Sequence, residues 1–113
     1  MKMWMVNPRL MCDKHLLGEH GELHKFMPSW GKQHSITGRE GAIEPRAYVQ
    51  RHDDLAHEMT RRGMSHKSPI RPPDFSYLPV DQQVWQVSIV DSHEMLINRC
   101  PDCQEKSHEN HLP

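Results

Sequence analysis

The sequence contains no apolar run longer than a few residues and no segment that resembles a signal peptide. A membrane-spanning helix needs about 20 consecutive apolar residues, so we expect no span and no membrane partner. Hydrophobic residues are also scarce overall, at 35% of the 113 residues, and the mean hydropathy is −0.83. A chain of this length suits one small domain with a thin core, and we assign 1–113 to a single domain.

An excess of positive charge is missing as well. The formal net charge is −1, so no global positive field draws the chain toward nucleic acid. The ten histidines make the protein more cationic below neutral pH, where they are partly protonated. The three cysteines, two of them in a Cys-x-x-Cys pattern, do not form the even-numbered framework of a secreted disulfide protein. We therefore expect a soluble, cytoplasmic protein.

Start and stop signals predict three main helices. Asn7 is a good N-cap and Pro8 suits the first helical position, so the first helix covers about 8–27. A second helix over 45–62 ends where two arginines precede a glycine. The third covers 81–100 and is stopped by a proline, and the β-branched character of 84–90 leaves a strand in its first half open as the alternative.

These elements predict an all-α fold, a compact single-domain bundle of three main helices. The remaining segments are an extended N-terminal stretch, two long loops and a polar tail, at 1–7, 28–44, 64–79 and 101–113. The first helix carries an apolar stripe on one side, formed by Cys12, Leu16, Leu23 and Met27. Glu19 and Glu22 lie on the opposite side, where we expect Glu22 to face solvent or a cleft and Glu19 to form a surface pair with His15, one turn away.

Met1 and Glu22 are the most informative pair of residues. Seven extended residues reach about 20–23 Å, and a helix from Pro8 to Glu22 rises about 21 Å. An N-terminal segment that folds back along the helix therefore brings the α-amine beside the carboxylate, which is a candidate Schiff-base centre. An α-amine has a reference pKa of about 7.7–8.0, so part of it is neutral near pH 7, whereas a lysine needs strong desolvation.

Several segments in order along the chain resemble the pyrimidine-dimer DNA glycosylase family of the phage endonuclease V type. They are CDKHLLGEHGEL at 12–23, RHDDL at 51–55, RRG at 61–63 and HK at 66–67. The stretch 78–101 is compatible with the last helix of that family. The resemblance implies a compact bundle of three helices that combines glycosylase and abasic-site lyase activity on double-stranded DNA. It also implies a monomer in bacterial or phage-infected host cytoplasm.

By resemblance, the N-terminal amine attacks C1′ of the damaged nucleotide, and Glu22 matches the glutamate that assists. In the best-known member the initiator methionine is removed, but Lys2 is too large for the usual removal here. The amine of Met1 then occupies the place of the nucleophile. Gly21 departs from the family, which has an arginine important for DNA binding at that position.

Positions where the family has basic or polar DNA-contacting groups are occupied by Lys2, Lys14, His15 and Lys25. Further basic residues are candidates for phosphate contacts, Arg39 among them. Trp30 lies in a polar stretch and is a candidate wedge that enters the base stack when a nucleotide is flipped. The lesion stays open: a cyclobutane dimer, another modified pyrimidine or an abasic site.

The family mechanism requires no cofactor, but the tail contains a candidate zinc site. Cys100 and Cys103 are followed by His108 and His111, and four N/S ligands can hold zinc tetrahedrally. The alternative is a pair of free thiols in a histidine-rich tail. Two other functions stay open: a non-catalytic DNA- or protein-binding module on the same fold, which Gly21 and the low net charge favour, and a small zinc-stabilised adaptor.

Overall fold

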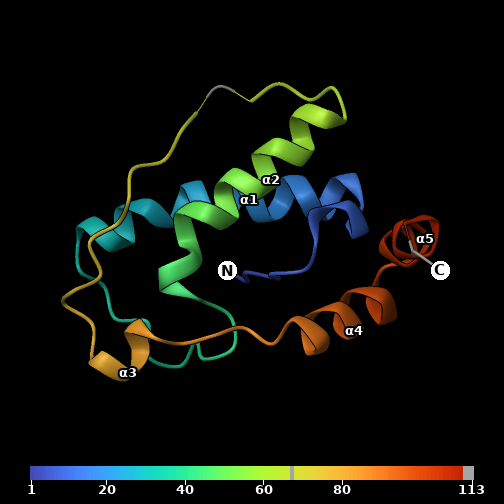
Figure 1. Ribbon diagram of the computed structural model, residues 1–113. Helices are drawn as coiled ribbons and strands as arrows, with labels where there is room; N and C mark the ends of the chain where they lie inside the picture. Colours follow the sequence, from blue (N-terminus) through green and yellow to red (C-terminus); the bar gives the residue numbers. More distant parts are fainter. Residues whose placement is uncertain (67, 111–113) are drawn as a thin grey trace.

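The computed structural model describes residues 1–66 and 68–110, and within these ranges it contains helices and no strand (Figure 1). The elements in chain order are η1 (Pro8–Leu10), α1 (Asp13–Gly31), η2 (Pro45–Ala47), α2 (Tyr48–Arg61), α3 (Val80–Gln83), α4 (Ile89–Arg99) and α5 (Pro101–Glu109). The prediction of an all-α fold with an extended N-terminal segment and long loops is confirmed.

The predicted first helix is divided in two. Asn7 caps the short turn η1, where its side chain accepts a hydrogen bond from the backbone of Arg9. The chain is then extended at Met11 and Cys12, and α1 begins only after Cys12, whose sulfur accepts from the backbone N–H of His15. Pro28 does not follow the helix but lies inside its last turn, where one missing N–H removes a single helical hydrogen bond.

The second helix agrees well with its start and stop signals. Pro45 opens the short turn η2, which continues directly into α2. Arg62 is the C-cap, and Gly63 follows with φ of +83°, a left-handed conformation that glycine adopts without a steric penalty. Tyr48, at the start of α2, is fully buried and donates its hydroxyl hydrogen bond to the carbonyl of Leu23 in α1.

The prediction of one third helix over 81–100 is wrong in detail. Only the single turn α3 and the separate helix α4 form there, and the β-branched stretch between them is not helical. Pro101 does not end the helical region; it occupies the first position of α5, which covers most of the tail that was predicted to be merely polar. Proline is compatible with both roles, because it cannot continue a helix but suits the start of a new one.

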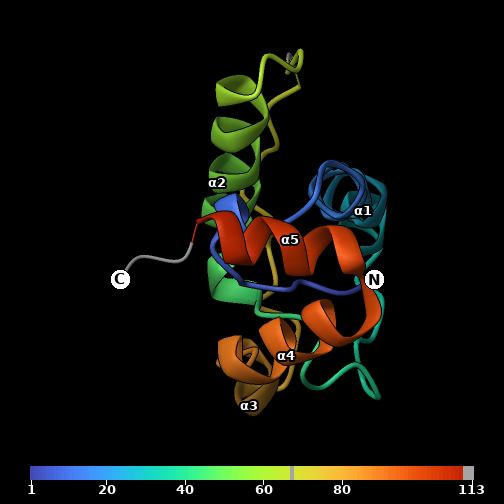
Figure 2. The ribbon, with the colours of Figure 1, turned by 90° about the vertical axis from the view of Figure 1, so that its right-hand side faces the viewer.

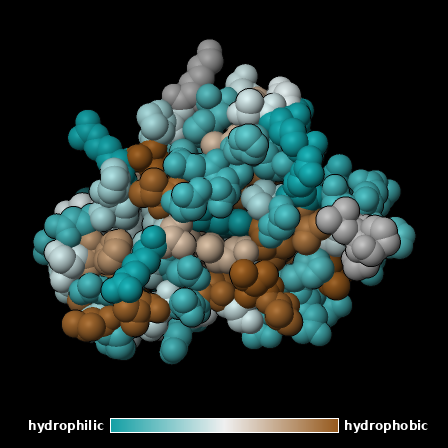
Figure 3. Space-filling model, in the orientation of Figure 1, coloured by the Kyte–Doolittle hydropathy of each residue, from teal (hydrophilic) through white to brown (hydrophobic). Residues whose placement is uncertain are grey.

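The N-terminal segment lies between the α1/α2 pair and α4 in both views of the ribbon (Figures 1 and 2). Met3 and Val6 are buried in the core, and the backbone N–H of Met3 donates to the carbonyl of Ala42 at 2.8 Å. The core is thin, as predicted, and several large apolar side chains stay exposed: Leu17, Val80, Val84, Ile89 and Val90. Figure 3 shows a mostly hydrophilic face with hydrophobic side chains exposed along its lower edge.

A buried ion pair joins the N-terminal segment to both long helices. Arg51 of α2 forms two hydrogen bonds with the carboxylate of Glu19 in α1, at 2.6 and 2.7 Å, and a third with the carbonyl of Val6 at 2.6 Å. The Arg51 and Glu19 side chains are only 3% and 0% exposed. The prediction of a surface pair between Glu19 and His15 is therefore wrong, because a buried carboxylate is stable when a cation with matching geometry pairs with it.

Candidate active site

The first seven residues run back along α1, and their start meets the predicted glutamate. The backbone N–H of Lys2 donates to Oε2 of Glu22 at 3.2 Å, and the Lys2 ammonium donates to the carbonyl of Gly41 at 2.6 Å. Met1 and Glu22 line one cavity of about 250 Å³, together with Lys25, Phe26 and Arg39. The cavity therefore brings the α-amine end of the chain to an exposed carboxylate of α1.

Two cations give this cavity a positive rim. Lys25 comes from α1, one turn after Glu22, and Arg39 comes from the loop between α1 and η2. The Arg39 guanidinium lies 5.6 Å from the centroid of the Phe26 ring, a cation–π arrangement that orients it at the cavity wall. Burial lowers the pKa of the Lys2 side chain, an effect that the charges of Glu19 and Asp91 oppose.

A larger cavity of about 540 Å³ lies at the other end of the N-terminal segment. Its wall includes Glu58. Hydrogen bonds donated by Arg61, and to a smaller extent by Arg62, hold the pKa of the Glu58 carboxyl at about 2, although burial opposes this shift. A carboxylate with so low a pKa is a poor proton donor or acceptor near neutral pH. Arg62 also donates to the backbone carbonyls of Pro8 and Met11, so this cavity is the weaker candidate.

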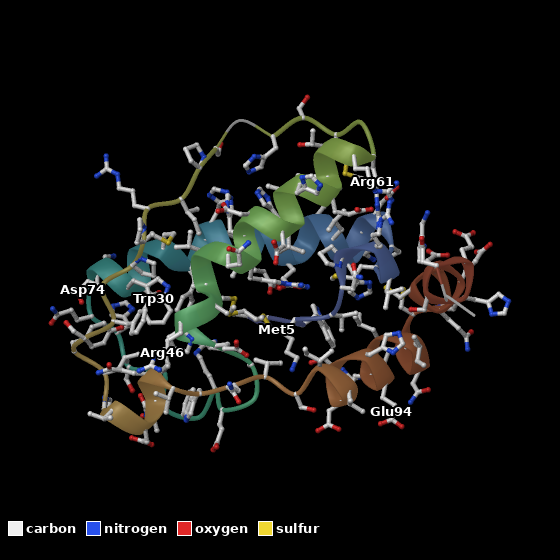
Figure 4. All side chains as sticks on the ribbon, in the orientation of Figure 1. Met5, Trp30, Arg46, Arg61, Asp74 and Glu94 are labelled. Atoms are coloured by element: carbon white, nitrogen blue, oxygen red, sulfur yellow. The ribbon has the colours of Figure 1, made fainter. Side chains whose placement is uncertain are left out.

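Of the remaining predicted contact residues, Lys14 is exposed on α1, about 16 Å along the helix axis from Lys25. Trp30, labelled in Figure 4, is only 2% exposed. Its ring packs edge-on against Phe26 and Tyr48. A ring enclosed in the core offers no free face to a base, so we assign Trp30 to packing and not to the base stack.

The cysteines of the tail find partners other than those predicted. Cys12 Sγ lies 3.8 Å from Cys100 Sγ and 3.3 Å from His15 Nδ1, and Cys103 Sγ lies 3.5 Å from the same nitrogen. All four ligand atoms lie within 4.8 Å of one another, so the cluster could hold a metal ion. Zinc–sulfur bonds of about 2.3 Å in a tetrahedron separate two sulfurs by about 3.8 Å.

This arrangement corrects the predicted ligand set. His108 lies on α5 beside a different cavity, with His93, and His111 lies outside the described residues. Two matching spacings in the sequence indicate this metal site: Cys12-x-x-His15 and Cys100-x-x-Cys103. Each spacing can supply two metal ligands from one turn of the chain. Nothing in the local pattern shows that these two turns meet, because they are 88 residues apart.

The first 72 residues match a family model whose description is pyrimidine dimer DNA glycosylase. The chain belongs to this family. It is therefore a DNA repair glycosylase at the level of its family, with DNA as the substrate. A search of curated proteins and a search of solved structures found no match.

The family match includes Met1, Glu22 and the loop residue Arg39, and it ends at residue 72. Cys100 and Cys103 lie beyond it, so the Cys/His cluster joins the glycosylase-like region to the C-terminal helices. None of the helices in 1–66 and 68–110 combines the length and the apolar character that crossing a bilayer requires.

Proposed function

We propose that this glycosylase removes damaged or modified pyrimidines from double-stranded DNA and then cleaves the abasic site, with the α-amine of Met1 as nucleophile. The observation that supports the proposal is the shared cavity of Met1 and Glu22, with the Lys2 backbone hydrogen-bonded to the same carboxylate. We propose further that the protein acts as a monomer in bacterial or phage-infected cytoplasm.

In the proposed reaction, the neutral amine of Met1 attacks C1′ of the damaged nucleotide and forms a C–N bond. The bond between C1′ and the base breaks, and the base leaves with a proton. The attached amine then loses a proton, the C1′–O4′ bond breaks as O4′ takes up a proton, and a protonated imine forms at C1′. Removal of a proton from C2′ then breaks the C3′–O bond, which releases the 3′ phosphate by β-elimination.

Glu22 has two tasks in this scheme. Its carboxylate stabilises the cationic imine electrostatically, since Met1 and Glu22 line one cavity. It also transfers protons as general base and acid during attack and elimination. The low-dielectric side of the cavity, formed by Phe26, strengthens both effects.

Phosphate binding falls to the cations near this cavity. Lys25 and Arg39 line the rim, Lys2 is adjacent, and Lys14 extends the contact along α1. Such contacts fix the position of the duplex without reading its sequence. We do not retain His15 in this set, because its Nδ1 faces the sulfurs of Cys12 and Cys103.

The decisive experiment is reductive trapping. Incubation of the intact chain with an abasic-site duplex and borohydride is expected to give a covalent protein–DNA adduct, and peptide mapping is expected to find it on Met1. Reductive methylation of the terminus under conditions that spare lysines is expected to abolish the adduct. A chain that binds the duplex but forms no adduct would support the alternative, a non-catalytic binding module, and an adduct on a lysine would refute the assigned nucleophile.

The missing arginine before Glu22 offers a gain-of-function prediction. Nothing lies within 4 Å of a Cβ built on Gly21, so Gly21→Arg is expected to fit, to stabilise α1 by about 0.5–1 kcal/mol and to strengthen duplex binding. Anisotropy titrations over a range of salt concentrations should show a salt slope steeper by about one. Gly21→Gln is the matched control, with a similar helix propensity and no charge. Equal affinities for both variants would show that this position does not face DNA.

We also propose that Cys12, His15, Cys100 and Cys103 hold a structural zinc ion. The set is complete with four protein ligands, which leaves no open position for substrate and is typical of structural sites. Backbone N–H groups of Cys12, His15 and Cys103 point at its sulfurs at 3.3–3.4 Å, and such donors stabilise thiolates. The zinc would tie α5 to the start of α1.

A further inference from the structure

A second cluster lies apart from the cysteines and consists only of histidines. His20 and His24 come from consecutive turns of α1, His52 comes from α2, and His66 comes from the loop that follows α2. Their ligand nitrogens all lie within 4.8 Å of one another. His52 is 1% exposed, and its ring centroid lies 4.8–5.0 Å from those of the other three. Three segments of the chain thus converge on one point.

Hydrogen bonds among the four rings do not satisfy their nitrogens. His52 Nδ1 lies 2.9 Å from the Asp53 carboxylate, which only accepts, so this nitrogen carries the proton and Nε2 of the neutral ring presents a lone pair. That one lone pair faces His24 Nε2 at 3.1 Å and His66 Nε2 at 3.3 Å. The Nε2 of His20 is buried and has no partner at all. Buried nitrogens without partners are costly, and a group that accepts several lone pairs at once would satisfy them.

A metal ion satisfies all four nitrogens together. Zinc–nitrogen bonds of about 2.0–2.1 Å in a tetrahedron separate two ligand nitrogens by about 3.3–3.4 Å, close to the observed 3.1 and 3.3 Å. The Asp53 carboxylate on His52 is the outer partner that a metal-bound imidazole usually has, because it fixes the tautomer with the lone pair turned inward.

We propose that His20, His24, His52 and His66 bind a divalent first-row transition metal ion of the zinc type. The site is structural, because four protein ligands close the coordination sphere. It fixes α1 against α2 and anchors the loop after α2, which otherwise has four prolines and no helix in its described residues. This inference stands on the histidine geometry and does not depend on the proposed glycosylase chemistry.

The ion also changes the electrostatics of the molecule. Four neutral imidazoles and a divalent cation add two positive charges, so a formal net charge of −1 becomes +1 when this site alone is filled. In the sequence, Glu22 stands between the ligands His20 and His24. On the helix, its side chain lies about 200° around the axis from that of His20. The metal site therefore lies on the face of α1 opposite Glu22, and it does not touch the candidate nucleophile.

Metal content of the purified full chain is the first test. We expect two zinc equivalents in the parent protein, one in His20→Asn and one in His66→Asn. His57→Asn, an exposed histidine on α2 outside the cluster, should keep both equivalents. Cys103→Ser should lose only the equivalent bound by the cysteine cluster. A parent protein with a single equivalent that both histidine variants retain would overturn the proposal.

The second test needs no variant and so avoids any loss of folding. X-ray absorption at the zinc edge of the fully loaded parent protein reports the average ligand shell. Two filled sites give more nitrogen than sulfur neighbours, whereas the cysteine cluster alone gives more sulfur than nitrogen. A nitrogen-rich shell supports the four-histidine site, and a sulfur-rich shell refutes it whatever the trapping experiment shows.

Discussion

Replacement of Glu22 by glutamine is expected to lower the rate of base excision and strand cleavage by about two to four orders of magnitude, the range for removal of a positioned acid–base group. The substitution preserves the size of the side chain and an oxygen acceptor for the Lys2 backbone N–H, now 3.2 Å away. It removes the negative charge that stabilises the imine and the group that exchanges protons. Single-turnover assays on a lesion-bearing duplex, with the protein in excess, measure this effect on the chemical step.

Binding and chemistry separate in this experiment. Because Glu22 contributes a negative charge close to the proposed phosphate contacts of Lys25 and Arg39, the variant should bind the duplex as tightly as the parent or more tightly. Glu94→Gln is the matched control, since Glu94 is an exposed carboxylate on α4 that points away from the core (Figure 4). If both variants turn over like the parent, Glu22 has no part in the chemistry.

The sequence predicted the helix boundaries best where backbone chemistry is local. Asn7 and Pro8 start a turn, and Gly63 ends α2 with a positive φ, because each of these residues restricts its own backbone. The approach of Met1 to Glu22 followed from chain lengths alone, since an extended segment and a helix of matching reach need only one reversal. These features depend on local backbone preferences or on a single reversal of the chain.

Features that depend on distant partners were not predicted. Glu19 looked like a solvated helix carboxylate because its partner, Arg51, lies 32 residues away. Cys12 lies in the core as predicted, but its contact with Cys100 was not predicted because the two cysteines meet only after α4 and α5 have packed. Trp30 was assigned to the base stack because its neighbours in sequence are polar, although its neighbours in space are aromatic. The composition of a segment describes the neighbours of a residue in sequence, but it does not describe its neighbours in space.

The buried pair of Arg51 and Glu19 carries the largest predicted effect on stability. Arg51→Met is expected to lower the free energy of unfolding by about 3–5 kcal/mol, because it leaves the Glu19 carboxylate buried without its counter-ion. The same change removes the donor to the Val6 carbonyl, so the N-terminal segment loses one of its anchors to α2. Urea unfolding followed by circular dichroism measures the change, with an unchanged slope indicating the same two-state reaction.

A second variant distinguishes the stranded charge from a loss of packing. Glu19→Leu combined with Arg51→Met replaces both charged groups by apolar side chains, and it should recover most of the lost free energy because no unpaired charge remains. Arg46→Met is the control, since Arg46 is an exposed arginine in η2 and should change stability by no more than about 0.5 kcal/mol. A single Arg51→Met variant as stable as this control would mean that the ion pair does not hold the fold together. The double variant also lacks the hydrogen bond from Arg51 to the Val6 carbonyl. If it is stable but excises bases poorly, this hydrogen bond supports activity by holding the N-terminal segment, and with it Met1, against α1.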